Sequence, residues 1–147
     1  ELYLRRFKNI PIIYTEYIPG REFTVDAFKD FENNIISIVP RERIEVREGE
    51  VQKSVTIKDN SIINDCKKIL ENLDIKGPVT IQLIKKEDIN FFTEINPRYG
   101  GGVILSIEAG ANSPAWIIDL LQGKKIQPLG DYKYSLYMTR ADREFFL

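Results

Sequence analysis

Alternation of apolar and polar side chains, with a period of two residues, dominates the first half of the sequence. Within 22–29, for example, every second side chain is apolar, at Phe23, Val25 and Ala27. This period predicts β-strands with one face in a core. Turn pairs such as Pro19-Gly20 and Gly49-Glu50 separate the alternating stretches. Because such short turns join neighbouring strands in opposite directions, the pattern favours an antiparallel sheet.

The period becomes helical between residues 59 and 73. Apolar side chains then recur every three or four residues, at Ile62, Ile63, Cys66, Ile69, Leu70 and Leu73. Asn60 or Ser61 is the expected N-cap. Cys66 lies in the apolar stripe, so we expect it to pack in the core and not to react.

The same reasoning assigns the remaining segments. It predicts strands over 10–18, 22–29, 35–46, 51–57, 79–84, 91–96 and 132–140. It predicts helices over 59–73, 103–109 and 116–121, the last capped by Ser113 with Pro114 at the first helical position. Adjacent strands with two or three helices indicate an α+β fold, a mainly antiparallel sheet, and disfavour a fully parallel one.

Length and charge exclude several classes of partner. The chain has 147 residues, enough for one domain with a core. Its 21 basic and 22 acidic side chains give a net charge of -1. This balance offers no footprint for nucleic acid or a membrane surface, and no apolar run is long enough to span a bilayer.

The residue types that are missing exclude further chemistry. The sequence has no histidine and one cysteine, Cys66. Nucleophilic mechanisms that use histidine, histidine metal sites and disulfides are therefore excluded within these residues. The single cysteine suits a cytoplasmic protein. A metal bound here is expected to be a hard cation with oxygen ligands.

The stretch TEINPRYGGG, residues 93–102, suggests such a site. Burying the apolar faces of the strands 79–84 and 91–96 together places Gln82 opposite Glu94. Gln82, Glu94 and Asn96 then present three oxygen donors on one face, a set that suits Mg²⁺ (or Mn²⁺). Arg98 is placed to neutralise a phosphate, and three glycines offer close backbone approach. A solvent-facing polar strand that ends in a turn would show the same pattern.

The motif EINPRYGGG resembles the metal-binding strand and turn of the ATP-grasp superfamily of ATP-dependent carboxylate-amine ligases. The resemblance implies that Gln82, Glu94 and Asn96 are metal ligands and that Arg98 is catalytic. Glutamine as the first ligand is closest to proteins similar to the carbamoyl-phosphate synthase large subunit. The resemblance therefore implies ATP and Mg²⁺ as cofactors.

A second motif, YTEYIPGREFTVDAF, resembles the family's hinge strand. The resemblance implies that Glu16 and Ile18, with Tyr17 between them, contact adenine, and that Glu22 binds the ribose hydroxyls. Taken alone, Glu22 reads as an exposed carboxylate on a strand, and the nucleotide role comes from the resemblance.

The stretch VPRERIEVREG places Arg41, Arg43 and Arg47 on one face of a strand. The family resemblance implies an anion-binding wall for the carboxylate substrate or an acyl phosphate. A solvated face with Glu45 as ionic partner is the alternative.

The resemblance covers the large, C-terminal lobe of the ATP-grasp fold as a single domain over 1–147. It implies a fragment that lacks the N-terminal lobe and the domain before it, and that is inactive alone. The expected partners are that lobe, carboxylate and amine substrates, and a second copy in a homodimer. The alternative function is a non-catalytic module that retains the fold to bind nucleotides or proteins.

Overall fold

A single six-stranded antiparallel sheet forms the centre of the computed structural model, which describes residues 11–141, 143 and 146. The strands lie in the order β5-β4-β1-β2-β3-β6. Their bounds are β1 Arg21–Lys29, β2 Ile35–Arg47, β3 Glu50–Thr56, β4 Gly77–Lys86, β5 Ile89–Asn96 and β6 Tyr137–Thr139. The helices are α2 Asn60–Glu71, α3 Val103–Glu108 and α4 Ser113–Leu121. The predicted α+β class is confirmed.

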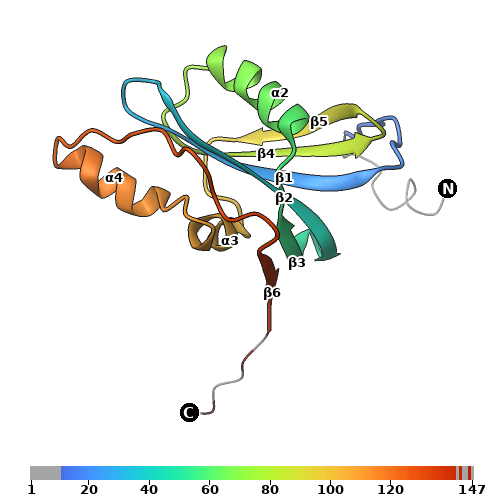
Figure 1. Cartoon of the computed structure of the whole chain (residues 1–147). Helices are drawn as coiled ribbons and strands as arrows, with labels where there is room; N and C mark the ends of the chain where they lie inside the picture. Colours follow the sequence, from blue (N-terminus) through green and yellow to red (C-terminus); the bar gives the residue numbers. More distant parts are fainter. Residues whose placement is uncertain (1–10, 142, 144–145, 147) are drawn as a thin grey trace.

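Helices lie on both faces of the sheet (Figure 1). The amphipathic helix α2 covers one face, whereas α3 and α4 lie on the other. Phe28 of β1 contacts Trp116 of α4, with ring centroids 5.7 Å apart. This contact packs α4 against the second face.

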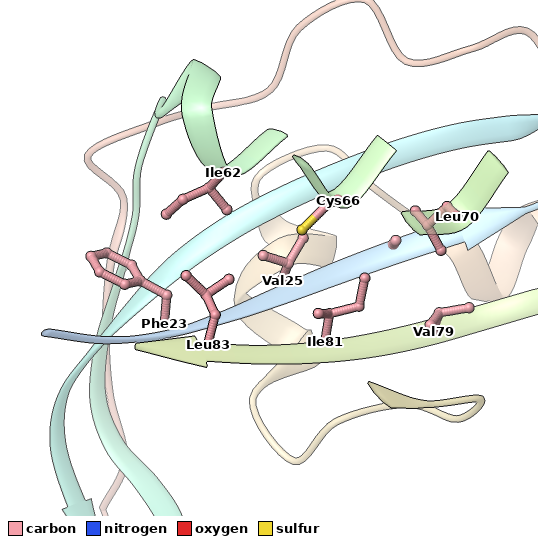
Figure 2. Packing of buried hydrophobic residues seen from close by; sticks show 9 residues of the cluster. Phe23, Val25, Ile62, Cys66, Leu70, Val79, Ile81 and Leu83 are labelled. Carbon is pink, nitrogen blue, oxygen red and sulfur yellow. The ribbon is translucent and has the colours of Figure 1, made fainter. Parts of the chain in front are cut away.

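The core lies between α2 and the central strands. Ile62, Cys66 and Leu70 point from α2 onto the sheet, where they meet side chains of β1 and β4 (Figure 2). Cys66 is fully buried. Burial, with a smaller contribution from the charge of Asp65, raises the pKa of its thiol to about 12. The expected packing role of this cysteine is confirmed.

Side chains at both ends fix the length of α2. Asp59 is the N-cap, in place of the expected Asn60 or Ser61, because its carboxylate accepts hydrogen bonds from the backbone of Ser61 and Ile62. At the other end, Lys29 of β1 is 1% exposed. Its ammonium group donates to the carbonyl oxygens of Leu70 and Leu73 at 2.6 and 2.7 Å. A buried cation therefore adds a donor to the carbonyl of Leu70, which also accepts from the backbone of Leu73, and supplies a donor to the carbonyl of Leu73 just beyond the helix.

We expect Lys29→Met to lower the free energy of unfolding by about 2 kcal/mol, because the carbonyl of Leu73 loses its donor inside the protein. Urea denaturation measures this loss. Lys68→Met is the control, because Lys68 is an exposed lysine of the same helix, and it should change stability by less than about 0.5 kcal/mol. Equal losses in both variants would contradict the capping role.

A β-bulge changes the predicted pairing of β4 and β5. Gln82 lies opposite Glu94, as predicted. Beyond this pair the register shifts, and Leu83 pairs with Phe92 instead of Thr93. The bulge lets Phe92 pack against the core from a sequence position that alternation assigned to the polar face.

Two predicted strands are wrong or too long. The described part of 10–18 is not a strand, because no described strand pairs with it, and isoleucine and tyrosine favour a strand only where a partner exists. The segment 132–140 contributes three paired residues only, since Ser135 has a φ of 58° and interrupts the extended backbone. In α4 the N-cap is Asn112, not Ser113.

Among the described residues, no helix is both long and apolar enough to cross a membrane.

Candidate functional site

The face of the sheet opposite α2 carries a row of polar side chains across four strands. Glu94 of β5 pairs with Gln82 of β4, Gln82 with Thr24 of β1, and Thr24 with Arg41 of β2. Strands lie about 4.8 Å apart, so this row spans roughly 14 Å from Glu94 to Arg41. We call it the polar face; the register brings together residues that are far apart in the sequence.

The three predicted metal ligands lie at the β4–β5 end of the polar face. The amide nitrogen of Gln82 donates to a carboxylate oxygen of Glu94 at 2.9 Å. Asn96 is half-buried, and its amide nitrogen lacks a hydrogen-bond partner among the described residues. The set contains one carboxylate and two amides. Accordingly, no group of three His, Cys, Asp or Glu able to hold a metal occurs in the described part of the chain.

Beside these residues lies a polar cavity of about 100 Å³, which we call the Arg41 cavity. Its walls include Arg41 and Arg43 of β2, Gln82 of β4 and Arg98 after β5. Glycines 100–102 also line it. Three predicted groups of residues thus meet here: one candidate metal ligand, the arginine of the Pro-Arg pair and two of the three arginines on β2.

Arg41 is held rigidly below the glycines. It is 1% exposed, and its Nε donates to Asp26 at 2.8 Å. The same carboxylate oxygen accepts from the Ser106 hydroxyl of α3 at 2.6 Å. A Cβ on Gly102 would lie 2.6 Å from Nη1 of Arg41, so only glycine leaves room for the guanidinium at this position. Nη1 itself is buried without a hydrogen-bond partner among the described residues.

Ion pairs form the rim of the Arg41 cavity. Arg43, whose side chain is 11% exposed, contacts Glu22, which is 56% exposed, at 3.2 Å. Opposite, Glu50 contacts Arg140 at 3.1 Å, and Arg140 also donates to the carbonyl of Gly101. The cations of β2 therefore point inward, whereas their acidic neighbour Glu22 lies at the solvent edge.

Arg98 reaches the same cavity from the turn after β5. Its Nη1 donates to the carbonyl of Tyr99 at 3.0 Å, and its own carbonyl accepts from Thr80 at 2.9 Å. These bonds position the turn while the guanidinium stays exposed. Such a group can contact an anion at the cavity mouth.

Other predicted site residues lie apart from this cavity. Glu16 and Tyr17 are exposed, Ile18 is half-buried, and all three precede β1 in an irregular segment. Arg47 is exposed at the end of β2, beyond two register irregularities that follow Arg43. The expected single face of three arginines therefore breaks up, and Arg41 and Arg43 alone line the cavity.

Asp26 and Ser106 are residues of the site that sequence reasoning missed. Asp26 sits within a strand whose other residues from 23 to 29 are buried. A carboxylate in such a strand signals a buried ionic partner, because an unpaired buried charge is costly. The serine of α3 gives no comparable signal.

The chain matches a protein family over residues 8–142, the family described as "ATP-grasp in the biosynthetic pathway with Ter operon". Among curated relatives, the carbamoyl phosphate synthase large chain of Caldanaerobacter subterraneus subsp. tengcongensis is 33% identical over 136 residues, which are 86% of this chain and 13% of that protein. That of Clostridium botulinum (strain Alaska E43 / Type E3) is 31% identical over 139 residues, with 88% and 13% covered. The chain thus spans about an eighth of the length of these relatives.

Solved structures show the same fold at low sequence identity. Biotin carboxylase of Campylobacter jejuni superposes with a TM-score of 0.67 and 16% identity, over 83% of this chain and 30% of that one. The biotin carboxylase domain of Hydrogenobacter thermophilus 2-oxoglutarate carboxylase gives 0.65 and 16%, over 82% and 29%. At such identity the likeness speaks for the fold alone. With the match over 8–142, it shows that the chain belongs to the ATP-grasp family and has the α+β fold of an ATP-grasp lobe.

Proposed function

We propose that this chain is the ATP- and magnesium-binding lobe of an ATP-dependent carboxylate-amine ligase or an enzyme similar to carbamoyl-phosphate synthase. The observation that carries the proposal is the polar face, which gathers Gln82, Glu94 and Asn96 beside a cavity lined by arginines. In the complete enzyme, the γ-phosphoryl group of ATP would pass to a substrate carboxylate. An amine would then attack the resulting acyl phosphate and release phosphate.

The donors at the β4–β5 end fit Mg²⁺ or Mn²⁺. Gln82, Glu94 and Asn96 would hold the ion, which takes few protein ligands and leaves its other positions to water and phosphate. When bound, the metal would neutralise charge on the phosphate oxygens. The hydrogen bond from Gln82 to Glu94 orients the carboxylate before any ion arrives.

The arginines supply the remaining positive charge. Arg98 at the mouth and Arg41 and Arg43 in the wall would hold the anionic groups in place during transfer. The wall is formed by buried or half-buried side chains, so their charges act in a medium with less screening than water. Phosphoryl transfer requires mainly such positioning and charge neutralisation.

The nucleotide would lie along the start of β1. In our proposal Glu22 accepts the ribose hydroxyls, and the backbone of Glu16 and Ile18 contacts adenine next to Tyr17. Residues 16–18 form an irregular segment in which Glu16 and Tyr17 are exposed. A second lobe would order it and close the adenine cleft, so the chain by itself should bind nucleotide weakly and not turn it over. The H. thermophilus domain, a structural neighbour, was solved with MgADP and bicarbonate, which supports ligands of this kind here.

Calorimetric titration of the chain with MgATP tests this proposal. We expect a Kd in the high-micromolar to millimolar range, which corresponds to a favourable binding free energy on the order of 4 to 6 kcal/mol. Glu22→Ala should weaken binding about tenfold, because two hydrogen bonds to a carboxylate are lost. Glu45→Ala is the control: Glu45 is also an exposed strand carboxylate, paired with Lys53 at 2.6 Å. Equal affinity of both variants would remove Glu22 from the nucleotide site, and no MgATP binding by the unchanged chain would overturn the proposal.

A further inference from the structure

The Arg41–Asp26 pair is expensive to bury and unusually well fixed. Both side chains are almost inaccessible, at 2% and 8% exposure. The attraction in such a pair often fails to repay the loss of hydration, so stability alone does not explain it. Two further atoms of the pair, Nη1 of Arg41 and Oδ1 of Asp26, lack hydrogen-bond partners among the described residues.

The direction of the guanidinium is set by three separate contacts. Its Nε is tied to Asp26, which Ser106 holds from the other side. Gly102 lies against Nη1, and a Cβ on Gly100 would be 3.4 Å from Nη2. The edge that carries the two Nη groups therefore lies against the glycines that, together with Arg41, line the Arg41 cavity.

We propose that Asp26 is a positioning residue, which holds Arg41 so that its Nη groups bind the oxyanion head of a ligand in the Arg41 cavity. The inference rests on the proposed function, because Arg41 is the buried member of the arginine wall of that site. A carboxylate or a phosphoryl group shares the needed chemistry, since each offers two oxygens to an arginine fork.

The size of the cavity limits what it holds. At about 100 Å³ it has room for a small polar group, since a single water needs about 10–15 Å³ of such space. An oxyanion head group fits this space. The rest of the ligand would extend past Arg43 and Arg98 at the mouth.

Arginine side-chain NMR tests the proposal directly on the chain. The Nε–H resonance of Arg41, assigned by its loss in Arg41→Lys, should be slow to exchange with solvent. Titration with inorganic phosphate, and separately with acetate, should shift it with saturation. The tighter of the two anions identifies the phosphoryl or the carboxylate head group as the better occupant, and either result supports the proposal.

Two variants separate the positioning role from the charge itself. Arg41→Lys should weaken phosphate binding about tenfold, as expected for the loss of a charged hydrogen-bond pair. Asp26→Asn should weaken it by a similar factor although Arg41 is retained, and its Nε–H should exchange faster. Unchanged affinity in Asp26→Asn would overturn the positioning role. Unchanged affinity in Arg41→Lys would overturn the oxyanion site as well.

The unchanged chain decides the question if Asp26→Asn does not fold. A saturable shift of the Arg41 resonance supports the proposal, whereas no shift with either anion overturns it. The proposed function fails separately, because its failure is the loss of MgATP binding in the unchanged chain. Phosphate binding without MgATP binding would keep the oxyanion site and remove the nucleotide site.

Discussion

Glu94→Gln should lower the magnesium-dependent ATP consumption of the proposed enzyme by at least about a hundredfold. Glu94 is the one carboxylate among the three proposed metal ligands, so the substitution removes the only negative charge in the set. Preorganised charges at sites of phosphoryl transfer typically contribute effects of this size.

The fold should survive this change. Glu94 is exposed and accepts a hydrogen bond from the amide of Gln82, which the side-chain oxygen of a glutamine at position 94 can also accept. Urea denaturation should therefore show a midpoint within experimental error of the unchanged protein.

Glu71→Gln is the matched control. Glu71 is an exposed carboxylate at the end of α2, and this helix covers the opposite face of the sheet. It should leave both ATP consumption and stability unchanged. ATP consumption near the normal rate in Glu94→Gln, with magnesium as the metal, would show that the metal assignment is wrong.

The strands around the site were predictable because their sequence pattern and their partners agree. The alternation in β1 and β4 follows from a core on the α2 side, and the pairing of Gln82 with Glu94 follows from burying two apolar faces together. The burial of Cys66 was predictable as well, because this residue lies in the apolar stripe of an amphipathic helix. In these segments local preference and tertiary packing have the same requirement.

Prediction failed where a distant contact decides. The bulge opposite Leu83 allows Phe92 to pack against the core. No local pattern within β5 indicates this bulge. The segment before β1 has the composition of a strand but no described partner. Arg47 follows two irregularities in the pairing of β2 and β3, which alternation does not foresee.

To predict the Arg41 cavity, the register between β1 and β2 had to be known. Thr24 lies opposite Arg41, so Asp26 lies diagonally across the strand pair from the arginine. Sequence reasoning identified Arg41 as a candidate but assigned no role to Asp26. The register that brings Asp26 close to Arg41 depends on the length of the turn between β1 and β2. Ser106, which donates a hydrogen bond to Asp26, comes from α3, far along the chain.

A double-mutant cycle on the buried pair should give the largest effect on stability. Asp26→Leu leaves Arg41 buried without a counter-charge, so we expect a loss of about 3 to 5 kcal/mol in the free energy of unfolding. Arg41→Met leaves Asp26 buried with the Ser106 hydroxyl, at a cost of similar direction. Denaturant unfolding measures each variant, and Asp26→Asn replaces Asp26→Leu if the latter does not fold.

The double variant Asp26→Leu, Arg41→Met should recover much of this loss, because two apolar side chains need no partner in the same space. A total close to the sum of the single losses would contradict the coupling inferred from the 2.8 Å contact. The recovered protein should nevertheless bind no inorganic phosphate in the Arg41 cavity. The double variant would then fold without the two charges. If it is stable but no longer binds inorganic phosphate, the pair serves ligand binding. If it retained normal phosphate affinity, the buried arginine would have no part in holding the ligand.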